Sequence, residues 1–153
     1  LVKRMPVLDL EGSEGGTADE ELTDGQLRAL ESARISYAPG GTNQRAGVAL
    51  TFPDNYIYTG LLAETADGTL LASPMELALI SLWANRMDPS QAIRGDFVEC
   101  EGTPTSTYAS DKILFDLACG QGQFGAKDFD GWYAVEGEIP PYEEPKKQAP
   151  LRI

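Results

Sequence analysis

The stretch SPMELALISLW, residues 73–83, has every feature that starts a helix in a globular domain. Ser73 is a favoured N-cap residue, Pro74 suits the first helical position, and Glu76 lies three residues after the cap, as a capping box requires. A nearly continuous apolar run follows, so this helix packs into a core. We expect it to continue to about Met87 and to end before Asp88-Pro89.

Working outward from this helix, helical and strand patterns alternate along the chain. Thr23 and Gln26 form a second capping box, followed by apolar residues at helical spacing up to Tyr37. Residues 45–52 and 56–62 read as a hairpin, and 64–69 as a loop. A strand over 93–100, a polar loop over 103–111, a helix near 113–119 and a strand over 132–139 complete the pattern. This alternation indicates an α/β fold with helices packed on a sheet.

Composition excludes several classes of function. The 153 residues carry 24 acidic and 12 basic side chains, a net charge of −12, which disfavours binding to nucleic acid. No apolar run is long enough for a transmembrane segment. The sequence has no histidine, so a Ser-His-Asp triad, a Cys-His pair and histidine metal ligands are all excluded. The two cysteines, Cys100 and Cys119, are expected to be free core thiols, although spacing alone leaves a disulfide open.

The two ends of the chain differ in composition from its middle. We expect residues 1–21 to form a flexible acidic arm, 22–142 a single domain, and 143–153 an extended proline-containing tail. The chain does not begin with Met, which suggests processing and is compatible with a removed presequence. We therefore hypothesise a location in the mitochondrial matrix or another organelle.

Five short segments, in order and spacing, resemble the small zinc-dependent cytidine deaminases. They are ARISYAPGGTNQRAGVAL (33–50), IYTGLLAETA (57–66), SPMELALI (73–80), ILFDLACG (113–120) and DFDGWYAVEGEIPPY (128–142). The resemblance covers roughly residues 25–142. It implies a three-layer αβα sandwich with a mixed sheet, and a subunit that associates into dimers or larger assemblies.

The resemblance also shows which catalytic groups to look for. In that family a His or Cys from an H/C-x-E motif and two Cys from a P-C-x-x-C motif hold Zn²⁺, and the Glu shuttles protons. Here Pro74 stands at the first ligand position and Glu76 at the proton-shuttle position. Pro104 matches the proline of the second motif. Its cysteine positions are then occupied, in one of two alignments, by Thr105 and Tyr108 or by Thr107 and Ser110.

The positions that bind the nucleoside have also changed. The Asn-x-Glu motif that holds the ribose reads Leu62-Ala63-Glu64, and Gln44 stands where an aromatic side chain is expected. The resemblance therefore implies no catalytic residue, no metal and no cofactor, with Glu76 and Glu64 as vestiges. We interpret Glu76 as a helix-capping residue and Glu64 as a solvated loop carboxylate or a turn stabiliser. The hydroxyls of residues 105–107 are expected to cap the following helix.

Three hypotheses for function follow. The first is a catalytically inactive structural or accessory subunit of a larger assembly, such as an organellar complex, whose partners are other subunits, a homologous deaminase-like chain or a second copy. The second is a module that binds a nucleoside-like small molecule. The third is a hydrolase with altered chemistry. In it, oxygen ligands drawn from Glu64, Glu76, Asp67 and Asp111 would hold Mg²⁺, Ca²⁺ or Mn²⁺.

Overall fold

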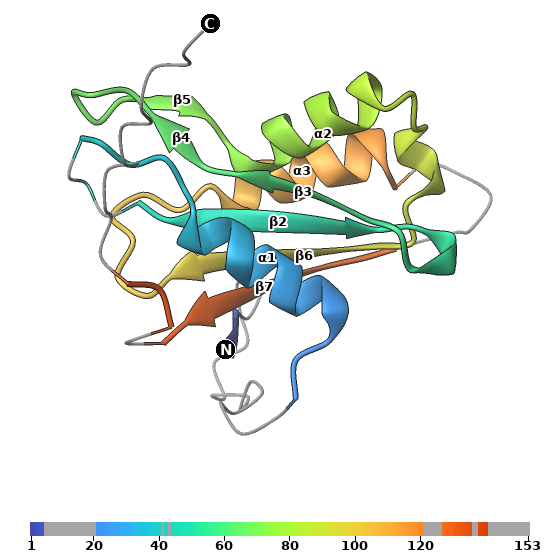
Figure 1. Ribbon diagram of the computed structural model, residues 1–153, viewed down its shortest axis with the longest axis horizontal. Helices are drawn as coiled ribbons and strands as arrows, with labels where there is room; N and C mark the ends of the chain where they lie inside the picture. Colours follow the sequence, from blue (N-terminus) through green and yellow to red (C-terminus); the bar gives the residue numbers. More distant parts are fainter. Residues whose placement is uncertain (5–20, 41, 43, 121–126, 136–137, 141–153) are drawn as a thin grey trace, which may run out of the picture.

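The computed structural model describes residues 1–4, 21–40, 42, 44–120, 127–135 and 138–140. Within them, one mixed sheet has the strand order β1-β7-β6-β2-β3 (Figure 1). Its strands are β1 (Val2–Arg4), β2 (Ala46–Thr51), β3 (Ile57–Leu61), β6 (Arg94–Cys100) and β7 (Asp128–Ala134). Strands β6 and β7 are parallel, and the other neighbouring pairs are antiparallel. The predicted α/β class with a mixed sheet is confirmed.

Helices cover both faces of this sheet and give the molecule three layers. Helix α1 (Asp24–Arg34) lies on one face, and α2 (Pro74–Ala84) and α3 (Tyr108–Ala118) lie on the other (Figure 1). A hydrophobic core lies on each face of the sheet. Strand β2 contributes side chains to both cores, because successive side chains of a strand point to opposite faces. Val48 and Leu50 pack with α2 and α3, whereas Ala49 packs with Ala29 and Ala33 of α1.

Two glycines allow the helices to approach the sheet closely. A Cβ atom on Gly47 of β2 would lie 2.4 Å from the carbonyl oxygen of Ala29 in α1. A Cβ atom on Gly60 of β3 would lie 2.0 Å from the carbonyl oxygen of Pro74 in α2. Since real Cβ contacts are never so short, these glycines fix how near each helix lies to the sheet.

Several predicted boundaries are wrong. Helix α2 ends at Ala84, because Arg86 adopts a left-handed conformation (φ 56°) and the Met87 N–H donates to the Leu82 carbonyl, as in a Schellman motif. Helix α3 begins at Tyr108, inside the segment expected to be a loop, and β7 spans 128–134 instead of 132–139.

Two short elements differ from the sequence expectation. Part of the expected loop over 64–69 instead joins a two-stranded sheet of β4 (Ala63–Glu64) and β5 (Leu70–Ala72). Val2–Arg4, placed in the N-terminal arm by sequence, form β1, because β7 offers backbone partners there. Residues 5–20 of that arm and all of the tail over 143–153 lie outside the described residues. In the part that the structure describes, no helix is both long and apolar enough to cross a membrane.

Candidate functional site

The N-terminus of α2 forms one half of the candidate site. The Glu76 N–H donates to the Ser73 hydroxyl at 3.3 Å, and Glu76 Oε1 accepts the Ser73 N–H at 3.0 Å. The predicted capping box is therefore present, with Pro74 buried at the first helical position and the Glu76 side chain exposed. The capping box satisfies two of the N–H groups that a helix start leaves without partners.

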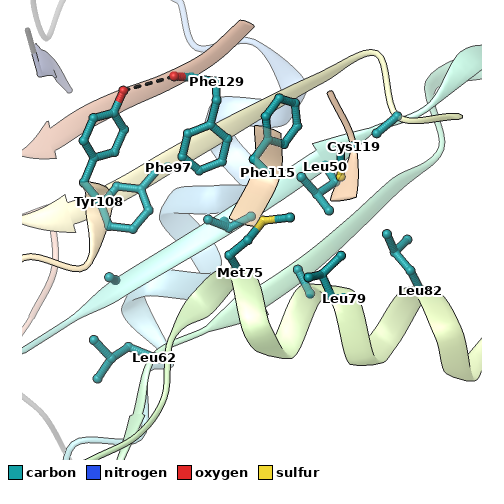
Figure 2. Close-up of a cluster of buried hydrophobic side chains, with 14 of the residues drawn as sticks. Leu50, Leu62, Met75, Leu79, Leu82, Phe97, Tyr108, Phe115, Cys119 and Phe129 are labelled. Atoms are coloured by element: carbon teal, nitrogen blue, oxygen red, sulfur yellow. Dashed lines mark hydrogen bonds between the residues drawn. The ribbon is translucent and has the colours of Figure 1, made fainter. Parts of the chain in front are cut away.

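The N-terminus of α3 forms the other half. Thr107 is its N-cap residue, but its hydroxyl donates to Asp111 Oδ2 at 3.2 Å and not to the helix backbone. Ser106 Oγ accepts the Tyr108 N–H at 3.1 Å, so the predicted capping by residues 105–107 is only partly realised. The Tyr108 hydroxyl donates to the Phe129 carbonyl at 3.0 Å, and its ring packs against Phe97 (Figure 2).

Asp111 connects the two helix starts. Its side chain is fully buried, and burial raises its pKa to about 6, opposed by the Ser73 hydroxyl, the Met75 N–H and the Thr107 hydroxyl, which all lower it. Its Oδ1 atom has no partner at full hydrogen-bond geometry. A carboxylate is favoured at helix N-termini, where the backbone N–H groups carry partial positive charge. Sequence reasoning placed Asp111 only among carboxylates of the general area, because its contacts with α2 depend on the tertiary structure.

Glu64 holds the loop that follows α1. It is fully buried, Oε1 accepts the Gly40 N–H at 2.9 Å, and Oε2 accepts the Thr42 hydroxyl at 2.5 Å. Of the two interpretations made from sequence, the solvated carboxylate is wrong and the turn stabiliser is correct. Asp67 instead lies exposed in the turn before β5. There, hydrogen bonds from the Thr65 hydroxyl and then from Thr69 lower its pKa.

The two other changed positions also have partners inside the protein. The Gln44 side-chain amide donates to the Thr105 carbonyl at 2.6 Å, which ties the segment before β2 to the loop before α3. Leu62 is buried in the same hydrophobic core as Met75 (Figure 2). Thr105 and Ser110 are exposed.

Neither cysteine belongs to the two helix starts, since Cys100 packs against the core on the α1 side of the sheet and Cys119 lies at the other end of α3. Cys100 ends β6 and Cys119 is the C-cap residue of α3, each as a free thiol, as expected. With a rise of about 1.5 Å per residue, Cys119 is about 16 Å from the start of its helix. Burial raises the pKa of its thiol to about 12. Among the described residues, no group of three or more Cys, Asp or Glu side chains is placed to hold a metal ion.

Comparisons with known proteins add a family and a set of similar folds. The sequence model of the family described as "Cytidine and deoxycytidylate deaminase zinc-binding region" matches residues 3–110, or 108 of the 153 residues. The structure of a cytidine deaminase from Burkholderia pseudomallei is similar at a TM-score of 0.51 and 21% identity, covering 62% of this chain and 76% of that one. The cytidine deaminase from Mycobacterium tuberculosis is similar at a TM-score of 0.50 and 14% identity, covering 67% of this chain and 85% of that one. No curated protein matches significantly in sequence.

Proposed function

The chain belongs to the cytidine and deoxycytidylate deaminase zinc-binding region family, and from that premise we propose that it is a catalytically inactive member. In this proposal it does not carry out zinc-dependent deamination. It serves as a structural or accessory subunit of a larger protein assembly. Its partners are other protein subunits, among them a homologous chain or a second copy.

The donor set at the two helix starts is the observation that carries the proposal. Catalytic zinc needs thiolate, imidazole or carboxylate ligands, and it makes hydroxide available near neutral pH. Pro74 has no side-chain donor, and the second motif offers only the hydroxyls of Thr105, Tyr108, Thr107 or Ser110, depending on the alignment. The chain has no histidine, and its two thiols lie at the far end of α3 and on β6. The carboxylates at the two helix starts are those of Glu76 and Asp111, fewer than the three protein ligands of a catalytic zinc, and the residues present therefore do not fit a zinc ion.

Internal contacts at the former substrate positions support the same conclusion. Both carboxylate oxygens of Glu64 accept hydrogen bonds from the loop, one from Gly40 and one from Thr42. The Gln44 side chain donates to the Thr105 carbonyl, and Leu62 is buried in the core. In this proposal Glu76 and Glu64 are vestiges kept for stability, one as a helix cap and one as a loop anchor. A framework that keeps its packing without its chemistry is suited to binding other proteins.

Zinc content and activity of the purified full chain test the inactive half of this proposal. We expect less than one zinc ion per ten chains by mass spectrometry of metals, and no conversion of cytidine or deoxycytidine to the uracil product. An active cytidine deaminase assayed in parallel is the control. Stoichiometric zinc or measurable turnover would overturn the proposal.

Co-purification tests the subunit half. The tagged chain, recovered from its native source at physiological salt, should elute within a complex of defined composition. Elution as a free monomer would count against this role.

Thermal stabilisation by nucleosides would favour a nucleoside-binding module instead. Tightly bound Mg²⁺, Ca²⁺ or Mn²⁺ would favour a hydrolase with an oxygen-ligated metal. Microscopy of the tagged protein in its native cells tests the hypothesis of an organellar location.

A further inference from the structure

Strand β3 forms an open edge of the five-stranded sheet. It pairs with β2 on one side, and no described strand lies on its other side (Figure 1). The Tyr56 carbonyl accepts the Phe52 N–H at 2.7 Å, and the direction of the backbone groups alternates along an antiparallel pair. The N–H and C=O groups of Ile57, Thr59 and Leu61 therefore point away from β2, where no described residue pairs with them. Such an edge can accept an added strand.

A cleft of about 450 Å³ lies between the start of β3 and helix α1. Leu27, Tyr56 and Ile57 give it apolar walls, and the first two of these side chains are 40% and 64% exposed. The Asn55 side-chain amide donates to Asp24 Oδ2 at 2.8 Å and so ties the β2–β3 connection to the start of α1. The cleft is therefore preformed. We call this cleft and the outer edge of β3 the α1/β3 groove.

Charge identifies the kind of partner that the α1/β3 groove fits. Asp24, Arg28 and Glu31 line the cleft, and the exposed Glu21 and Asp54 flank it in sequence. Four of these side chains are acidic and one is basic, a net charge of −3. An acidic groove attracts basic segments and repels acidic ones. A segment that carries Lys or Arg is therefore favoured over a second copy of this chain, whose net charge is −12.

An extended peptide would use both the edge and the cleft. Its backbone would pair with the outward groups of β3, and every second side chain would point to the α1 side of the sheet. Ile57 packs on the core of that same side, so these side chains would enter the cleft beside α1. A helical segment or a small molecule in the cleft would leave the backbone groups of the edge without partners.

We propose that the α1/β3 groove binds an extended, basic segment of another protein by strand addition. Thr59 lies at the paired edge, Tyr56 at the apolar wall, and Glu31 faces the basic side chains of the segment. The inference rests on the proposed function in one respect, that the chain is a component of an assembly. It adds which surface takes part and the chemistry of the segment that it binds.

A phage-displayed library of random peptides of about 12 residues, selected on the full chain, tests this inference. The selected peptides should alternate Lys or Arg with β-branched or aromatic residues and lack central proline. Synthetic copies should bind in solution with dissociation constants below about 100 μM. A selection that yields no peptide above the background of an unrelated protein, or only acidic or proline-rich peptides, overturns the proposal.

Three substitutions test where the selected peptides bind. Thr59→Pro removes an outward N–H that β2 does not use, Tyr56→Ala removes an apolar wall, and Glu31→Lys reverses a charge. Each should weaken binding at least about 10-fold, because each removes a different part of the groove. The loss caused by Glu31→Lys should be smaller at 0.5 M salt, where charges are screened.

Each substitution has a matched control that should leave binding unchanged. Thr59→Val keeps the outward N–H. Trp83→Ala removes an aromatic side chain that is 59% exposed on α2, and Asp116→Lys reverses a charge on α3, both on the other face of the sheet. Circular dichroism verifies that each variant is folded, and if Thr59→Pro does not fold, the other two substitutions decide. Peptides that bind Tyr56→Ala and Glu31→Lys as tightly as the wild type overturn the proposal.

The remaining outcomes separate this inference from its alternatives. Deletion of residues 143–153, which include Lys146, Lys147 and Arg152, should leave peptide binding unchanged. Tighter binding after the deletion would assign the groove to the chain's own tail and overturn the proposal. A chain without zinc or activity that joins a complex but selects no peptide would overturn this inference alone. A chain that binds the peptides but also holds zinc and deaminates cytidine would overturn the proposed function alone.

Discussion

Asp111→Asn should change how the stability of this protein depends on pH. The Asp111 carboxyl is buried where the N-termini of α2 and α3 meet, and burial raises its pKa to about 6 from 3.8. The amide has nearly the same size and accepts the Thr107 hydroxyl bond through its oxygen. The substitution therefore removes the titration while changing the packing little.

The direction and size of the change in the free energy of unfolding with pH follow from this pKa. The folded chain keeps the Asp111 proton to a higher pH than the unfolded chain does, so the free energy of unfolding falls as pH rises from about 3.8 through 6 and is constant above that. A shift of about two units corresponds to a total of about 3 kcal/mol. About 1 kcal/mol of this change falls between pH 5 and pH 8.

Urea unfolding at pH 5, 6, 7 and 8, followed by circular dichroism, measures the effect. The quantity that matters is the stability of Asp111→Asn minus that of the wild type, because other titrating groups cancel in this difference. We expect the difference to rise by about 1 kcal/mol from pH 5 to pH 8. Asp116→Asn, on the same helix with a side chain 54% exposed, is the control for the loss of one carboxylate from α3. A flat line for Asp111→Asn would refute the assignment of a raised pKa to this carboxyl.

Three further substitutions test the packing and capping of the fold. Gly60→Ala should destabilise the protein by about 3 kcal/mol in urea unfolding, since its Cβ atom would lie 2.0 Å from the Pro74 carbonyl oxygen. Glu64→Gln should cost about 1–3 kcal/mol and speed proteolysis within residues 38–42, because an amide cannot accept hydrogen bonds through both of its end atoms. Ser73→Ala should cost about 1 kcal/mol in thermal or urea unfolding through loss of the α2 cap.

Each of these has a matched control. Gly102→Ala meets no atom within 4 Å and should cost only the strain of its positive φ, so an equal loss at both glycines would contradict the packing argument. Glu31→Gln, on the exposed side of α1, should leave proteolysis unchanged. Ser73→Thr keeps the hydroxyl and should restore most of the stability, and a loss as large as that of alanine would show that capping is not the cause.

Local sequence patterns predicted the elements of this fold well where their hydrogen bonds are local. Both capping boxes were predicted correctly, because each closes between residues three apart, at Thr23 and at Ser73. The end of α2 was missed, since a Schellman motif with Arg86 in the left-handed conformation lacks the usual glycine signal. Strand β1 was missed because three residues have no pattern of their own and depend on β7 for pairing.

In the candidate site, too, the sequence predicted the local features and missed those that depend on distant segments. By itself the sequence determined which atoms the chain can offer: no imidazole, two thiols, a proline at the start of α2 and hydroxyls at the start of α3. Only the tertiary structure decided that Asp111 reaches across to α2, that Glu64 holds a loop 24 residues away, and that Ile80 and Trp83 point outward. The physical reason is the separation along the chain between the residues that interact. Donor chemistry and helix caps are properties of a few neighbouring residues, whereas burial, shifted pKa values and exposed faces arise only when distant segments pack together.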